Sequence, residues 1–82
     1  MYTIYYKEDN EKVINAVKLI TSLKANYIKK AIGTQNEENV LKNKLGVQMP
    51  KTYPIILIGD LLIGTIEELK LWVKDQKKKN KK

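Results

Sequence analysis

The sequence predicts an α/β domain in which three helices pack against a mixed four-stranded sheet, in the order β-α-β-α-β-β-α. Short runs of β-branched and aromatic residues alternate with stretches whose apolar residues recur at helical spacing. The most apolar run, residues 53–58, leads through Gly59-Asp60 into a second short apolar run, which predicts an antiparallel hairpin. A helix between the first two strands predicts that these strands are parallel and joined by a right-handed crossover.

The first half of the chain supplies this crossover unit. Tyr2–Tyr6 has the composition of a strand. Apolar residues at helical spacing predict a helix over residues 10–23, and Asp9 or Asn10 would cap its first turn. The second strand is expected over residues 27–32.

A second helix and the hairpin follow. Glu37 and Glu38 favour the N-terminus of the helix, and Gly46 suits its end. The strand over residues 53–58 is apolar throughout, which predicts burial on both faces, and residues 61–63 would pair with it. A last helix begins after Gly64-Thr65, and its expected inward-facing residues are Ile66, Leu69, Trp72 and Val73.

The formal net charge of +7 is unevenly distributed. Residues 77–82 hold five of the sixteen lysines, and without them eleven lysines face nine acidic residues, a net charge of +2. We therefore predict one domain over residues 1–76 and a lysine-rich, disordered tail over residues 77–82. Such a tail can bind nucleic acid weakly by releasing counterions, but it lacks arginine and interleaved aromatic residues, so we do not expect nucleic acid as a main partner.

No stretch of the sequence has the character of a membrane span or a signal peptide. The longest apolar run, residues 54–58, is far shorter than the roughly 20 residues that a span requires, and no basic segment precedes a long apolar stretch near Met1. We expect a cytoplasmic protein that makes no membrane contact. The exclusive use of lysine as the basic residue, with abundant Asn and Ile, is typical of an AT-rich coding genome and favours a viral source.

The chain contains no cysteine and no histidine. This excludes disulfides, thiolate nucleophiles, Fe–S clusters and cysteine-based zinc sites. It also excludes Ser-His-Asp and Cys-His catalysis. The sequence therefore predicts no metal site and no catalytic residue of these kinds.

Two stretches carry patterns that are more specific than the order of elements. One is Thr52-Tyr53-Pro54, followed by the hairpin and by Gly64-Thr65 at the start of the last helix. The other is residues 4–20, with a lysine ahead of the first helix and an alanine within it. Together they resemble the glutaredoxins over about residues 2–75. The resemblance implies a thioredoxin-like fold and a cis peptide bond before Pro54.

In this resemblance, the two redox cysteines of the family align with Asn10 and Val13. A helix N-terminus activates a cysteine by stabilising its thiolate, which then attacks disulfides. Asn10 has no thiol, and we expect its amide oxygen to cap the helix instead. Val13 is expected to pack in the core. We therefore predict that the chain is not an enzyme and that glutaredoxin activity is lost.

The resemblance also implies a groove for glutathione or for an extended peptide. The backbone of Tyr53, next to Pro54, would pair with the ligand. Lys7 would meet a ligand carboxylate. The structural alternative is that Pro54 only serves the fold and that Lys7 is solvated.

The start of the last helix would form the other end of this groove. After Gly64, main-chain N–H groups at Thr65, Ile66 and Glu67 would meet a second carboxylate, and the Glu67 side chain would meet an amine. In the structural alternative, Gly64 is a relic of the fold and Glu67 caps its own helix.

The predicted function is a redox-inactive binding module that uses this groove to dock a protein partner or to oligomerise. Glu11 and Lys12, in the turn aligned with the family's active site, are the candidate partner-binding residues. The alternatives are a glutathione-binding protein of redox homeostasis, with glutathione as the one possible ligand of cofactor type, and weak nucleic-acid binding through the tail.

Overall fold

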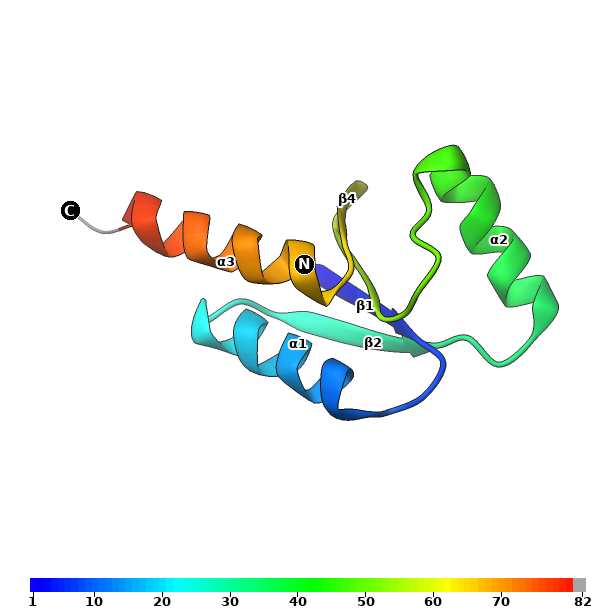
Figure 1. The fold of residues 1–82 in the computed structure, drawn as a ribbon, viewed down its shortest axis with the longest axis horizontal. Helices are drawn as coiled ribbons and strands as arrows, with labels where there is room; N and C mark the ends of the chain where they lie inside the picture. Colours follow the sequence, from blue (N-terminus) through cyan, green and yellow to red (C-terminus); the bar gives the residue numbers. More distant parts are fainter. Residues whose placement is uncertain (81–82) are drawn as a thin grey trace.

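The computed structural model describes residues 1–80 and contains a mixed four-stranded sheet with the strand order β2-β1-β3-β4 (Figure 1). Strand β1 is parallel to β2 and antiparallel to β3, and β3 is antiparallel to β4. This confirms the predicted α/β class and connectivity. The elements are β1 (Tyr2–Tyr6), α1 (Glu11–Ser22), β2 (Tyr27–Ala31), α2 (Gln35–Leu45), a 3-10 turn (Gly46–Gln48), β3 (Ile55–Ile58), β4 (Leu61–Gly64) and α3 (Ile66–Asn80).

One face of the sheet packs against α1 and α3, and this interface holds the larger part of the core (Figure 1). Trp72 is half-buried, and its Nε1 donates a hydrogen bond to the hydroxyl of the buried Tyr2 over 2.9 Å. The predicted inward-facing residues of the last helix are thus confirmed. The buried residues of this cluster are Tyr2, Ile4, Val13, Ala16, Ile20, Ile56, Ile66, Leu69 and Val73.

The opposite face of the sheet is covered by α2 through a smaller cluster. Leu41 of α2 packs with Ile55 and Leu57 of β3, and all three are buried. Because Ile56 belongs to the other cluster, β3 is buried on both faces, as its continuous apolar sequence predicts. Figure 1 shows α2 at one end of the molecule and the C-terminal half of α3 extending toward the other end.

Helix α2 begins with a capping box. The Thr34 hydroxyl accepts a hydrogen bond from the Glu37 N–H over 3.2 Å, and the Glu37 carboxylate accepts one from the Thr34 N–H over 3.1 Å. Both bonds satisfy N–H groups that have no partner within the helix. The helix ends at Gly46, whose φ of 62° lies in the left-handed region that favours glycine.

The prediction of a disordered tail is wrong for residues 77–80, the part of the tail that the structure describes. Helix α3 continues to Asn80, so residues 77–80 are helical, while the last two residues of the predicted tail lie outside the described part of the chain. Lysine is a good helix former and is favourable near a helix C-terminus. An ion pair of 3.4 Å between Asp75 and Lys79 also links successive turns of the helix.

Within residues 1–80, no helix combines the length and the apolar character that crossing a membrane requires.

Candidate functional site

Asn10 caps helix α1 at the position where the resemblance places a reactive cysteine. Its Oδ1 accepts hydrogen bonds from the N–H groups of Lys12, over 3.1 Å, and Val13, over 3.3 Å. The Val13 side chain is buried in the main core. Both expectations for these positions are therefore confirmed: the amide caps the helix and the valine packs.

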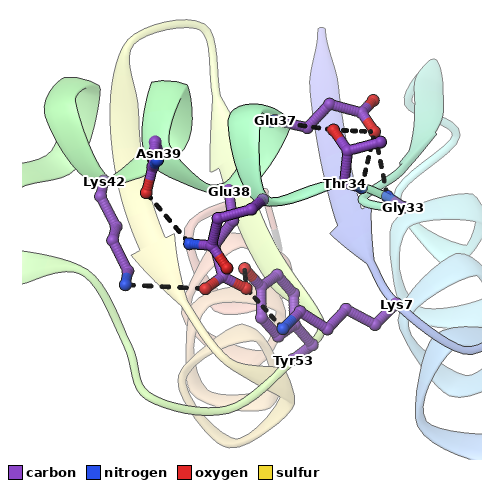
Figure 2. Close-up of polar contacts among 9 residues, drawn as sticks. Lys7, Gly33, Thr34, Glu37, Glu38, Asn39, Lys42 and Tyr53 are labelled. Carbon is purple, nitrogen blue, oxygen red and sulfur yellow. Dashed lines mark hydrogen bonds and ion pairs between the residues drawn. The ribbon is translucent and has the colours of Figure 1, made fainter.

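Lys7 lies in a charged cluster with Glu38 and Lys42 of α2 and with Tyr53 (Figure 2). Lys7 forms an ion pair with Glu38, and its Nζ lies 5.0 Å from the centre of the Tyr53 ring. The Tyr53 hydroxyl donates a 3.4 Å hydrogen bond to Glu38, and Lys42 Nζ lies 3.6 Å from Glu38 Oε1. The lysine that was predicted to meet a ligand carboxylate thus meets a carboxylate of the chain itself.

These contacts shift three pKa values. The hydrogen bond with Glu38 raises the pKa of Lys7, although partial desolvation opposes this shift. The hydrogen bond from Lys7 lowers the pKa of Glu38, with further lowering by the charges of Lys7 and Lys42. Burial raises the pKa of Tyr53, and the neighbouring charge of Glu38 raises it further. The cluster therefore holds Lys7 and Glu38 in their charged forms near neutral pH.

We expect this cluster to make stability depend on pH through Glu38. Because the pKa of Glu38 is lowered from 4.5 in the folded protein, its contribution is present above pH 4.5 and is lost as the pH falls below that value. Because the pKa of Lys7 is raised from 10.5, its contribution is present below pH 10.5 and is lost at higher pH. The thermal unfolding midpoint of the wild type should therefore fall more steeply on acidification than that of Glu38→Gln.

A control for this comparison is Glu8→Gln, which changes an exposed glutamate outside the cluster and should follow the wild type. Parallel acid profiles for Glu38→Gln and the wild type would show that the ion pair does not contribute to folding.

Lys7 and Glu38 line two cavities. The first has a volume of about 270 Å³ and is completed by residues from the end of β2 to the start of α2, Ile32, Gly33, Thr34 and Gln35. The second has a volume of about 290 Å³ and is completed by Lys42, Met49, Pro50, Lys51 and Tyr53. Three lysines and one glutamate surround the second cavity, so it favours a negatively charged group.

The Tyr53–Pro54 peptide bond is cis, the isomer that the resemblance implies. Pro54 is buried and precedes β3, which begins at Ile55 rather than at the predicted residue 53. Within residues 1–80, the main chain of Tyr53 makes no backbone hydrogen bond. Its N–H and C=O therefore have no main-chain partner in this part of the chain.

The start of α3 carries a carboxylate of its own. Glu68 Oε1 accepts hydrogen bonds from the Thr65 N–H over 3.2 Å and from the Thr65 hydroxyl over 3.0 Å. Gly64 has a φ of 125°, and a Cβ built there would lie 2.8 Å from Glu68 Oε1, so only glycine fits under this side chain. The structural alternative assigned the cap to Glu67, but Glu68 makes the contact.

The structure brings only part of the predicted site together. Lys7 and Tyr53 belong to one cluster, whereas residues 64–67, at the junction of β4 and α3, line neither of the two cavities. The side chain of Ile66 is buried in the main core. Glu11 and Lys12 are exposed in the first turn of α1 and also line neither cavity.

Sequence reasoning missed four residues around these positions: Glu38, Lys42, Lys51 and Glu68. The spacing of Thr65 and Glu68 matches a capping box, so that contact had a local signal. Glu38 and Lys42 are four residues apart on a helix, which predicts their mutual contact but not their approach to Lys7. Among residues 1–80, no group of three metal-ligating side chains comes together.

No family model matches the chain, and a search of curated proteins gives no significant match. Among solved structures, the chain is similar to the solution structure of a glutaredoxin from Brucella melitensis. The two share 19% sequence identity and superpose with a TM-score of 0.69, over 96% of this chain and 84% of that one. The chain thus has a thioredoxin-like fold of the kind seen in that glutaredoxin, and its sequence lacks the cysteines on which glutaredoxin chemistry depends.

Proposed function

We propose that this chain is a redox-inactive binding module whose groove beside Pro54 holds an extended segment of a protein. The observation that carries the proposal is the main chain of Tyr53, which makes no backbone hydrogen bond within residues 1–80, at a residue that lines the second cavity together with Lys7 and Glu38. A free stretch of backbone can pair with an extended segment, and neighbouring cavities can take its side chains.

The two cavities suit side chains better than a large ligand. Their volumes of about 270 and 290 Å³ lie just below the range of about 300–1,000 Å³ that is usual for small-molecule sites. The second cavity is lined by Lys7, Lys42 and Lys51 against a single carboxylate, that of Glu38. We therefore expect the bound segment to place an acidic side chain in it.

Glutathione binding is the alternative, and two contacts argue against it. Lys7 already forms an ion pair with Glu38, and the Thr65 N–H already donates a hydrogen bond to Glu68. According to the resemblance, Lys7 would meet one carboxylate of glutathione, and the Thr65 N–H is one of the three N–H groups that would meet the other. A free anion would have to displace a carboxylate that is held within the chain at each position. A segment that pairs with Tyr53 can instead place its acidic side chain against Lys51, which forms no ion pair within residues 1–80.

A photo-crosslinking side chain at Lys51, which lines the second cavity, tests the proposal in cells that make the full chain. The matched control carries the same group at Lys18, an exposed residue of α1. We expect an adduct from position 51 and none from position 18, with the attachment mapped to an extended, acidic segment. An adduct with the chain itself identifies a second copy as the source of the segment, and any other adduct identifies a separate partner.

Two further measurements separate the alternatives. Lys12→Glu should weaken the adduct only if the first turn of α1 belongs to the same surface. Titration with glutathione should leave the amide resonances of Tyr53 and Thr65 unmoved. Shifts at both residues would favour glutathione binding, and equal adducts from positions 51 and 18 would refute the groove.

A further inference from the structure

The C-terminal part of α3 is an exposed, strongly basic helix. Among residues 66–79 of α3, Val73 is the last buried residue, and the side chains of Lys74, Asp75 and Lys77 beyond it are exposed. Residues 70–80 contain five lysines and one acidic residue. Figure 1 shows this part of the helix extending toward the end of the molecule opposite α2. It is therefore well removed from the groove beside Pro54.

The helical geometry gathers these lysines on one side. At about 100° per residue, Lys70, Lys74 and Lys77 fall within about 60° of arc, and Lys78 lies about 40° beyond Lys74. Neighbouring members of the set 70, 74 and 77 are about 4.5–6 Å apart along the axis. We call these four residues, Lys70, Lys74, Lys77 and Lys78, the lysine face.

The lysine face has no anionic partner within the described chain. Asp75 pairs with Lys79, which does not belong to the lysine face, over 3.4 Å. Among residues 1–80, no carboxylate forms an ion pair with any lysine of the face. A row of like charges without partners favours a ligand that carries a row of opposite charges.

The composition of this helix distinguishes between polyanions. A helix that lies on a membrane needs an apolar face to insert. Leu71 is the one strongly exposed large apolar side chain among residues 70–79, and residues 74–80 contain no apolar side chain, so this part of α3 has no such face. Duplex nucleic acid presents about one phosphate charge per 1.7 Å of its axis, and each lysine that neutralises a phosphate releases a counterion. Lysine contacts to phosphate oxygens fix the position of a protein on a duplex but carry no sequence information.

We propose that the lysine face of α3 binds the phosphate backbone of duplex nucleic acid without reading its sequence. Four phosphate contacts give an expected salt slope of about −3.6, and so a loss of affinity on the order of 100-fold between about 50 mM and about 200 mM salt. Affinity should be the same for duplexes of different sequence. RNA and DNA duplexes share this phosphate chemistry, and titrating both distinguishes the two sources.

Fluorescence anisotropy of a labelled duplex, titrated with the full chain, tests the proposal. Lys74→Glu/Lys77→Glu should weaken binding by more than tenfold and lower the magnitude of the salt slope by about 2, because each lost lysine contact removes about one unit. The matched control is Lys18→Glu/Lys44→Glu, which removes the same net charge from exposed residues elsewhere. It should retain a slope close to that of the wild type.

Three outcomes would overturn the proposal. One is the absence of salt-dependent binding by the wild type, and another is an equal loss in the two double variants. The third is tighter binding to vesicles containing phosphatidylserine, or to polyglutamate, than to the duplex. Because circular dichroism reports the helix content of each variant, a loss of binding with unchanged helicity is assigned to the lost charges.

Discussion

Asn10→Cys is expected to create a thiol that ionises near or below pH 7. The N–H groups of Lys12 and Val13, which now donate to Asn10 Oδ1, would donate to the thiolate in the same position. An ordinary cysteine has a pKa of about 8.5, and cysteines at helix N-termini reach values of about 3.5–7.5. The start of α1 would thus still provide the N–H groups that stabilise a thiolate. In the natural protein these N–H groups are bound by the capping side chain of Asn10.

The direct readout for Asn10→Cys is thiolate absorbance followed against pH. Ser22→Cys, at the opposite end of α1, is the matched control because a thiolate is disfavoured at a helix C-terminus. Its titration midpoint should lie at or above about 8.5. Alkylation of Asn10→Cys at pH 7 should be faster by only about threefold, because a thiolate of lower pKa is also a weaker nucleophile.

Loss of the asparagine cap should cost Asn10→Cys about 1 kcal/mol, so the variant should still fold. Equal titration midpoints for the two cysteine variants would mean that residue 10 does not occupy the activated position. That result would contradict the alignment of Asn10 and Val13 with the two redox cysteines of the glutaredoxins. It would leave the fold assignment, which rests on the sheet topology and on the structural similarity, in place.

Leu69→Ala is expected to have the largest effect on stability. The Leu69 side chain is fully buried in the main core, where α3 packs with α1 and the sheet. Truncating a buried leucine costs about 2–5 kcal/mol through lost burial and the cavity that remains. A chain of this length has a total stability of roughly 4–12 kcal/mol, so the variant should lose a large share of it.

Leu71→Ala provides the matched control, because Leu71 lies on the same helix but is 70% exposed. Its effect on the free energy of unfolding should stay within about 0.5 kcal/mol. Urea denaturation of the two variants and the wild type measures the difference. Equal stabilities for Leu69→Ala and Leu71→Ala would contradict the packing of α3 and, with it, the orientation of the lysine face.

Much of the fold could be predicted because its signals are local. Helical spacing of apolar residues predicted the inward side of α3, and continuous apolarity predicted the double burial of β3. The place before the first helical turn predicted a cap at Asp9 or Asn10, and the structure has it at Asn10. The lysine run predicts disorder by its charge, but residues 77–80 are helical because lysine itself favours helix.

The candidate site was less predictable because its contacts join distant parts of the chain. Lys7 is close to Glu38 only because α2 packs on β3 through Leu41, and no local pattern encodes that approach. The same packing brings Lys42 and Lys51 to one cavity with Tyr53. By contrast, the contact between Thr65 and Glu68 spans three residues and was present in the sequence as a capping pattern.

The sequence alone determined that this protein has no thiol and no imidazole, and it thereby excluded thiol–disulfide exchange and catalysis by cysteine or histidine. It also determined the order of its elements, since periodicity and capping act within a few residues. The tertiary structure alone decided that Glu38 pairs with Lys7 and that the backbone of Tyr53 forms no backbone hydrogen bond with the rest of residues 1–80. Such contacts depend on the position and orientation of a helix on a sheet, and the packing of the whole core determines both.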